Sequence, residues 1–262
     1  MLHKEFGLIS IIMAAYNAEK TIELAIESVL NQTYSNFELL VINDCSKDRT
    51  AKLVEAFSAK DNRVRLISNE KNCGVSFTRE HGLEEAKGAW IAVLDSDDAW
   101  APEKLEKQIE LQNRTNADLL FTGSAFMDSD GRPIDWYLHA PEEVTYRQLL
   151  KQNILSNSSA LVRKELYAKY YAVGDGMHED FAIWLSILKE GKKAYGVDEP
   201  LLIYRIAKSS KSGNKVKAAK MNWNTYRYIG LNPVEAAYYE GWYMIKNVIK
   251  YTNIKISGGG AR

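Results

Sequence analysis

An acidic cluster carries the strongest chemical signal in the sequence. Asp95, Asp97 and Asp98 fall within four residues, directly after the apolar run 90–94. Three carboxylates this close repel one another unless a cation lies among them, and Mg²⁺ and Mn²⁺ prefer oxygen ligands of this kind. The cluster is therefore a candidate site for a metal that also binds substrate phosphate. The alternative is a solvated turn in which an aspartate caps the helix that Pro102 would open.

A second polar cluster begins at Asp44, just after the apolar run 37–42. A carboxylate at this point could accept a hydrogen bond from the N–H of a nucleotide base. Ser46, Asp48 and Thr50 follow it, and all three are residue types that cap helices. We expect Ser46 or Asp48 to cap the next helix and Asp44 to face a binding cleft.

Three further positions suit a nucleotide site but also have ordinary explanations. Tyr16 offers an aromatic face to a base, or packs as any tyrosine does. Gly74, in Asn72-Cys73-Gly74, permits a positive φ or a close backbone approach. Arg79 could pair with phosphate through two N–H groups, or could simply lie on the surface.

Glu179 and Asp180 open a predicted helix and are candidates for a general base. A carboxylate within hydrogen-bond reach of a hydroxyl can take its proton as the hydroxyl attacks. The helix dipole alone also favours acidic residues at a helix start, which is the ordinary explanation. His178 is a lesser candidate for the same role.

The elements that would position these residues alternate between strand and helix. Short apolar runs predict strands, at 8–14, 37–42, 64–67, 90–94 and 119–122, with helical patterns between them. This alternation implies crossover connections and a mostly parallel sheet, and such sheets bind ligands beyond the carboxyl ends of their strands. Because Tyr16, Asp44 and Asp95 each follow a predicted strand, we expect them to converge on one cleft.

The second half of the chain is less regular. Residues 156–162 and 201–206 predict short strands, and the pattern becomes helical beyond Lys208, with a boundary near Lys211. The segment 234–256 mixes apolar with basic residues, which is typical of an amphipathic helix resting on a membrane. The alternative is a helix that packs on the core or on another subunit.

Composition excludes several classes of protein. The chain has 262 residues and a formal net charge of zero, so no basic field supports a nucleic-acid partner. No apolar run approaches the roughly 18 residues of a membrane-spanning helix, and we see no secretory signal. Cys45 and Cys73 do not make a disulfide framework, so we expect a reducing cytoplasm. Neither a G-x-G-x-x-G motif nor a P-loop is present.

Taken together, these motifs resemble the family 2 glycosyltransferases, which have the GT-A fold. The resemblance covers roughly residues 8–210 and rests on these motifs in order: Ala15-Tyr16-Asn17, Asn43-Asp44-x-Ser46-x-Asp48-x-Thr50, Asn72-x-Gly74 with Arg79, Leu94-Asp95-Ser96-Asp97-Asp98, and Glu179-Asp180. It implies an α/β protein, a three-layer α/β/α sandwich around a mostly parallel sheet, with a C-terminal helical segment. The implied division is a GT-A domain over 1–211, with a nucleotide-binding half of about 1–125 and an acceptor half of about 126–211, then a helical appendage and flexible tail over 212–262.

The resemblance also implies a reaction and a role for each residue. The protein would be an inverting, metal-dependent enzyme of cell-surface polysaccharide biosynthesis that moves a sugar from a UDP-sugar to an acceptor hydroxyl. Asp180 would be the base, and Asp97 would ligate Mn²⁺ or Mg²⁺. The implied donor-binding residues are Ala15, Tyr16, Asn17, Asp44, Asn72, Gly74, Arg79, Asp95 and Ser96, with Asp44 on the uracil. The Gln-x-x-Arg-Trp motif of processive synthases is replaced by Tyr204-Arg205, which favours adding one sugar per encounter.

The expected partners are a nucleotide-sugar and a saccharide or lipid-linked saccharide acceptor. We expect a cytoplasmic protein that could contact the inner face of the cell membrane through its C-terminal helix, or form a homo-oligomer. Two alternative functions stay open. A nucleotidyltransferase would usually bring a Gly-rich, basic loop after the first strand, which segment 14–18 lacks. A non-catalytic nucleotide-sugar-binding module would keep Asp44 and Asp97 but would not need Asp180.

Overall fold

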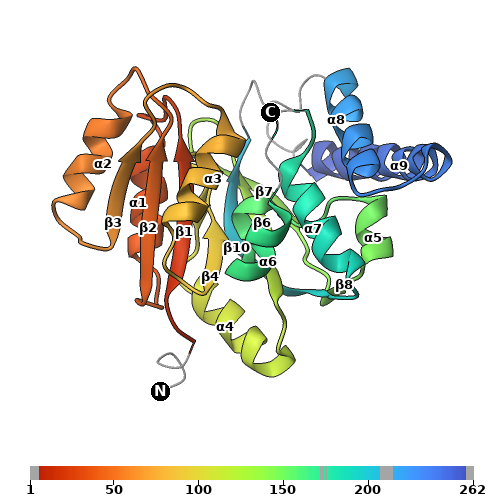
Figure 1. Ribbon diagram of the computed structural model, residues 1–262, viewed down its shortest axis with the longest axis horizontal. Coiled ribbons are helices and arrows are strands. Elements are labelled where there is room, and N and C mark those ends of the chain that lie inside the picture. The colour runs from red at the N-terminus through yellow and green to blue at the C-terminus, as the bar shows by residue number, and fades with distance from the viewer. Residues whose placement is uncertain (1–5, 172–173, 175, 207–214, 258–262) are drawn as a thin grey trace.

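The computed structural model describes residues 6–171, 174, 176–206 and 215–257. Ten strands form one sheet whose main path has the order β3-β2-β1-β4-β9-β6-β10-β5, with β7 beside β6 and β8 beside β10 (Figure 1). The strands are β1 (Ile9–Ala15), β2 (Phe37–Asn43), β3 (Val64–Ser68), β4 (Trp90–Val93), β5 (Ala99–Trp100), β6 (Leu119–Met127), β7 (Pro133–Leu138), β8 (Glu143–Val144), β9 (Leu161–Arg163) and β10 (Ala194–Arg205).

The long strand pairings are parallel. β1 pairs in parallel with both β2 and β4, β2 pairs with β3, and β6 pairs with β10. The short β9 lies antiparallel between β4 and β6, so these two strands point the same way. The carboxyl ends of β3, β2, β1, β4, β6 and β10 therefore meet along one edge. The mostly parallel sheet predicted from the strand–helix alternation is confirmed.

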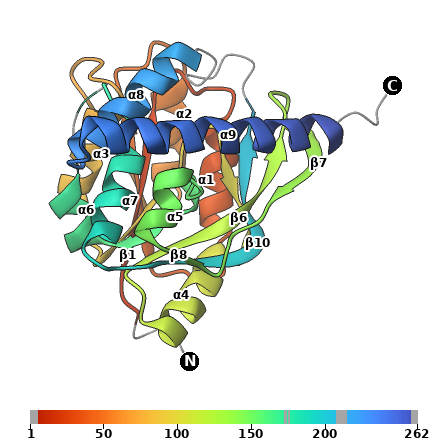
Figure 2. The ribbon, with the colours of Figure 1, turned by 90° about the vertical axis from the view of Figure 1, so that its right-hand side faces the viewer.

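Helices cover both faces of this sheet (Figures 1 and 2). They are α1 (Ile22–Leu30), α2 (Thr50–Ser58), α3 (Val75–Glu85), α4 (Lys104–Thr115), α5 (Tyr146–Lys151), α6 (Lys164–Tyr170), α7 (Glu179–Lys189), α8 (Lys215–Tyr228) and α9 (Pro233–Ser257), with a short 3₁₀ helix η2 (Asn157–Ser159). One buried cluster contains Ile11 and Met13 of β1 and joins α1, α2 and α4 to one face of the sheet. A second contains Ile12 and joins α3, α5 and α9 to the other face. Because successive side chains of β1 point to opposite faces, the molecule is the predicted three-layer α/β/α sandwich.

Helix α3 carries candidate site residues and packs directly on the sheet. A Cβ atom at Gly82 would lie 2.7 Å from side-chain atoms of Ile12 and Ile42, so glycine lets the helix approach β1 and β2. The helix begins after Gly74, whose φ is 84°, as its residue type allows without a steric cost. The positive φ considered for this glycine is confirmed.

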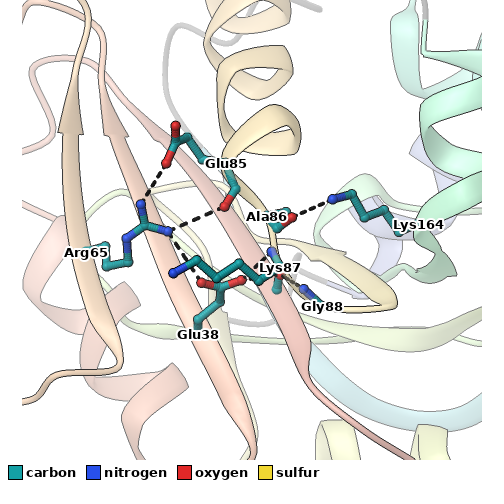
Figure 3. Close-up of polar contacts among 8 residues, drawn as sticks. Glu38, Arg65, Glu85, Ala86, Lys87, Gly88 and Lys164 are labelled. Atoms are coloured by element: carbon teal, nitrogen blue, oxygen red, sulfur yellow. Dashed lines mark hydrogen bonds and ion pairs between the residues drawn. The ribbon is translucent and has the colours of Figure 1, made fainter.

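At the amino ends of the parallel strands, opposite the edge where their carboxyl ends meet, a polar network surrounds Glu38 (Figure 3). The Glu38 carboxylate accepts hydrogen bonds from the Ser10 hydroxyl at 2.6 Å and from the Lys87 main-chain N–H at 2.7 Å. Arg65 lies 3.5 Å from Glu38 and pairs with Glu85 at 2.7 Å. Because Ser10 and Glu38 stand near the amino ends of β1 and β2, the network ties both strands to the turn between α3 and β4.

Helices α8 and α9 share the core of the main domain. Tyr226 is buried, donates its hydroxyl to the Leu150 carbonyl at 2.6 Å, and has its ring centroid 5.9 Å from that of Phe181. Ala236 of α9 belongs to the same buried cluster. Within the described part of the chain, no helix is both long enough and apolar enough to cross a bilayer. The boundary near Lys211 and the tail 258–262 lie outside the described residues, and the domain division stays a prediction.

Strand limits in the second half differ from those expected. Residues 156–162 form η2 followed by β9 instead of one strand, and the Ser159 hydroxyl donates to the Ser156 carbonyl at 2.7 Å. Such local bonds compete with strand pairing. β6 and β10 are longer than 119–122 and 201–206 because they pair with each other along most of their length. The short β5 was not expected and joins the edge of β10.

Candidate active site

A cleft of about 380 Å³ opens beyond the carboxyl ends of β1 and β4. The predicted site residues that line it are Tyr16, Asn17, Arg79, Asp95, Ser96 and Asp97. Those that lie outside its lining are Ala15, Asp44, Asn72, Gly74 and Asp180. Tyr16 is 51% exposed, so a face of its ring is accessible to a ligand. The structure thus brings the loop after β1, helix α3 and the acidic turn into one cavity.

The loop after β1 is held by side chains that follow β2. The Asn17 N–H donates to the Ser46 hydroxyl at 3.0 Å, and the Ala18 N–H donates to the Thr50 hydroxyl at 2.8 Å. Asn17 itself has a φ of 51°, which asparagine tolerates better than most residues. Asp48 accepts the N–H of Thr50, the first residue of α2, at 2.9 Å, but the N-cap position itself is Arg49, which makes no side-chain cap bond. Ser46 does not cap α2, and its hydroxyl holds the loop after β1 instead.

Asp44 organises the loop that precedes α3. Its carboxylate accepts hydrogen bonds from the main-chain N–H groups of Cys73 at 2.8 Å and Gly74 at 2.9 Å, and from the Asn69 amide at 2.9 Å. Burial alone would raise the pKa of Asp44, but these hydrogen bonds outweigh it and hold the pKa below its usual value. The residue is 3% exposed. The expectation that Asp44 faces the cleft is therefore corrected: its carboxylate faces the 72–74 loop, whose N–H groups point at it.

The acidic turn places its carboxylates in different surroundings. Asp95 pairs with Arg79 at 2.5 Å. Asp97 lines the cleft and is partly exposed, and burial followed by the charge of Asp95 raises its pKa. Asp98 is 2% exposed and accepts the main-chain N–H of Arg205 at 2.9 Å. Burial and the charges of Asp95 and Asp97 raise the pKa of Asp98 well above its usual value. The turn is thus built into the fold and does not cap α4.

Two residues hold the acidic turn in a role that was not predicted from the sequence. Arg205, at the end of β10, donates its Nε–H to the Asp97 carbonyl at 2.8 Å. Ser158 accepts the Asp95 N–H on its hydroxyl at 3.2 Å, and its carbonyl accepts the Trp100 indole N–H at 2.7 Å. The usable signals were weak: a single arginine that ends an apolar strand, and a short Asn-Ser-Ser run. Both contacts join residues more than fifty positions apart.

The first turn of α7 reaches the cleft wall through Glu179. The Arg79 guanidinium lies between Asp95 and Glu179, and the Ser76 hydroxyl donates to the same glutamate. Burial raises the pKa of Glu179, and the charge of Arg79 opposes this rise. Asp180 follows Glu179 directly and is partly exposed. His178 stands at the N-cap position of α7 and makes no capping side-chain bond.

The acidic turn suits a metal that shares its coordination with substrate. Among the described residues, no three His, Cys, Asp or Glu side chains are grouped to hold a metal ion. Mg²⁺ and related ions are commonly bound by one or two carboxylates together with substrate phosphates and water. Asp97 fits that pattern because it lines the cleft and because burial, followed by the nearby charge of Asp95, raises its pKa.

Comparisons with known proteins agree on the family and the fold. The family model described as "Glycosyl transferase family 2" matches residues 10–170. The Bacillus subtilis glycosyltransferase TuaG, named for teichuronic acid biosynthesis, is 39% identical over 85% of this chain and 88% of its own. WfgD of Escherichia coli, named as a UDP-Glc:alpha-D-GlcNAc-diphosphoundecaprenol beta-1,3-glucosyltransferase, is 36% identical over 93% and 95%.

Solved structures resemble the fold at low sequence identity. S. aureus TarS 1–349 in complex with UDP-GlcNAc has a TM-score of 0.68 and 21% identity, covering 87% of this chain and 69% of that one. The mannosyltransferase PcManGT from Pyrobaculum calidifontis, in complex with GDP-Man and Mn²⁺, has a TM-score of 0.67 and 15% identity, covering 89% and 68%. These neighbours confirm the expected GT-A fold.

The hydrogen bonds of Asp44 make a pH-dependent contribution to stability. Because its folded pKa lies below the ordinary value of 3.8, the contribution is complete above that value and is lost as pH falls through the folded pKa. We expect Asp44→Asn to lower the free energy of unfolding by about 1–3 kcal/mol at neutral pH. In urea denaturation, the difference between the two proteins should narrow below about pH 4. A difference that stayed constant down to about pH 3 would contradict this assignment.

Proposed function

The chain belongs to glycosyl transferase family 2 and is a glycosyltransferase, and on this premise we propose that it moves a sugar from a UDP-sugar to an acceptor hydroxyl with inversion at the anomeric carbon. The reaction uses Mn²⁺ or Mg²⁺ and belongs to cell-surface polysaccharide biosynthesis. The observation that carries the proposal is one cleft lined by Tyr16, Arg79 and the acidic turn at the carboxyl ends of β1 and β4. Family membership disfavours the nucleotidyltransferase and the non-catalytic module.

The nucleotide-sugar lies in this cleft. Tyr16 presents an exposed ring to the base, Asn17 and Ser96 line the cavity, and Ala15 ends the strand beneath it. The contact of Asp44 with the uracil requires the 72–74 loop to move, because its N–H groups now occupy the Asp44 carboxylate. Structural neighbours hold UDP-GlcNAc and GDP-Man, and WfgD is named for UDP-Glc, which supports a nucleotide-sugar donor.

Of the remaining donor-binding residues, Asp95 and Arg79 line this cavity, and Asn72 and Gly74 lie outside its lining. Asn72 and Gly74 carry the loop that Asp44 holds, because the Asn72 amide donates to the Asp44 carbonyl at 3.2 Å. Asp95 contacts the ribose or the neighbouring part of the donor, and its ion pair with Arg79 holds the Asp95 carboxylate in place. Asp97 ligates the metal. When bound, the metal stabilises negative charge on the diphosphate as a Lewis acid.

Asp180 is the general base of the proposed mechanism. It takes the proton of the acceptor hydroxyl, the hydroxyl oxygen bonds to the anomeric carbon, and the bond from that carbon to UDP breaks. One displacement inverts the anomeric centre. Its place in the first turn of α7, beside a glutamate that pairs with the cleft residue Arg79, supports this role.

Replacing the proposed base should stop the chemistry without preventing donor binding. We expect Asp180→Asn to lower kcat by about 10²-fold to 10⁴-fold, the range that a positioned base contributes. The affinity for UDP, measured by calorimetry with Mn²⁺, should stay close to that of the wild type. Asp135→Asn, a change at an exposed aspartate of β7, serves as the matched control. Wild-type turnover in the Asp180 variant would remove this residue from the mechanism.

Metal dependence can be tested at Asp97. We expect wild-type protein to bind UDP more tightly with Mn²⁺ than in the presence of EDTA. Asp97→Ala should reduce that difference at least about tenfold, because the ion loses its protein ligand. Titration calorimetry measures both quantities, with Asp135→Ala as the control. If the variant bound UDP with an unchanged manganese effect, Asp97 would not be the ligand.

The exposed side of α9 is the surface through which we propose that the protein contacts a membrane that holds its acceptor. Val234, Tyr238 and Ile245 recur at spacings of four and seven residues, share one side of α9, and are each more than half exposed. The opposite side carries the buried Ala236. Lys246 is exposed and Lys151 lies over the Trp242 ring at 5.4 Å, so basic groups border the apolar side. This chemistry suits an anionic lipid surface.

A lipid-linked saccharide is the acceptor class that fits this surface. WfgD and a second Escherichia coli relative, WfaP, are named for a diphosphoundecaprenol-linked acceptor. Such acceptors place the protein in the cytoplasm, at the inner face of the cell membrane. The competing occupant of the exposed side of α9 is a second copy of the chain.

Membrane contact can be separated from self-association by point substitutions. We expect the wild-type protein to float with vesicles rich in anionic phospholipid, and the triple variant Val234→Ser, Tyr238→Ser, Ile245→Ser to lose at least about half of that binding, since the apolar area is removed. Leu24→Ser, at another exposed apolar position, is the control. Unchanged flotation of the triple variant contradicts the proposal, and a wild-type dimer that this variant dissociates favours the second copy.

A further inference from the structure

The ion pairs of Arg79 join segments that lie far apart in the sequence. Its guanidinium contacts the carboxylate of Asp95 at 2.5 Å and also that of Glu179. Arg79 belongs to α3, Asp95 follows β4, and Glu179 begins α7. The side chains of Arg79 and Glu179 are more than nine-tenths buried. One side chain therefore links the acidic turn of the cleft to the first turn of α7.

Both carboxylate oxygens of Glu179 are engaged by α3. Oε1 pairs with Arg79, and Oε2 accepts the hydroxyl of Ser76, which lies three residues earlier on the same side of α3. Tyr171 in turn donates its hydroxyl to the Ser76 carbonyl at 2.6 Å. Glu179 is therefore buried and bonded within the protein, and it is not placed to take a proton from a substrate.

Burial of α7 does not require these charges. Phe181, Ile183 and Trp184 are fully buried, and apolar burial of this kind holds a helix against the core without a preferred direction. A buried ion pair with hydrogen bonds at both ends is directional, and it is costly unless its geometry is well satisfied. It fixes the rotation of the first turn of α7. Because neighbouring helix residues differ by about 100° around the axis, fixing Glu179 also fixes the direction of Asp180.

We infer that Arg79 and Glu179 are positioning residues that hold Asp180 at a set place relative to the acidic turn. The inference rests on the proposed function, in which Asp180 is the base. Asp95 contacts the donor in that function, so the same guanidinium supports the donor site and the base together. Loss of the Glu179 charge should therefore reduce turnover more than donor binding.

The test compares Glu179→Gln with the wild type. UDP release from UDP-glucose is measured with Mn²⁺ and GlcNAc-diphosphoundecaprenol, and with water as the acceptor. We expect kcat to fall about tenfold or more, while KM for UDP-glucose and the affinity for UDP stay within about twofold. Ser76→Ala, a smaller change that removes one hydrogen bond to Glu179, should lower kcat a few-fold in the same pattern.

Glu38→Gln provides a matched structural control. Like Glu179, Glu38 is buried, accepts a serine hydroxyl and lies beside an arginine, but at the opposite end of the sheet. The substitution Glu38→Gln should lower the melting temperature of the protein and leave kcat unchanged. If Glu179→Gln reduces kcat no more than Glu38→Gln, or raises KM instead, the positioning role is wrong. If the wild type and Asp180→Asn release UDP equally fast, the proposed function itself fails.

Discussion

Parallel strands that end together are the constraint on which the whole site depends. β1 and β4 lie side by side in fixed register, with Ile12 opposite Val93. The loop after β1 and the acidic turn after β4 are therefore neighbours, although about eighty residues separate them in the chain. Main-chain hydrogen bonds set this proximity before any cleft side chain contributes to it. β2 pairs with β1 in the same parallel way, so the segment after β2 also lies beside the loop after β1 and forms hydrogen bonds with it.

The fold separates the charges of a crowded acidic motif. Asp95 is compensated by Arg79, Asp98 is buried against the end of β10, and Asp97 is left at the cleft. Arg205 secures this arrangement by bonding to the main chain of the turn. Repulsion among carboxylates that are adjacent in sequence is thereby reduced without a dedicated cage of protein ligands. A cleft lined by Asp97, and by an Asp95 that is already paired with Arg79, is suited to an ion that arrives with its substrate.

Local patterns predicted the elements well and the directions of side chains less well. Alternating apolar runs placed β1, β2, β4 and the loops that follow them, because burial on both faces leaves a continuous apolar signature. The partners of Arg79 were not predictable, since Glu179 is one hundred residues away and nothing local marks the pair. Asp44 was expected in the cleft, but the N–H groups that capture its carboxylate come from a loop whose conformation depends on Gly74.

Strand β9 determines how the chain can be divided. Its three residues fill the gap between β4 and β6, yet they come after both in the sequence. A fragment that stopped at residue 125 would contain β4 and most of β6 but not the strand that joins them, and the bare edge of β4 would be open to pairing with other chains. The predicted nucleotide-binding half of about 1–125 therefore needs residues 161–163 to complete its part of the sheet.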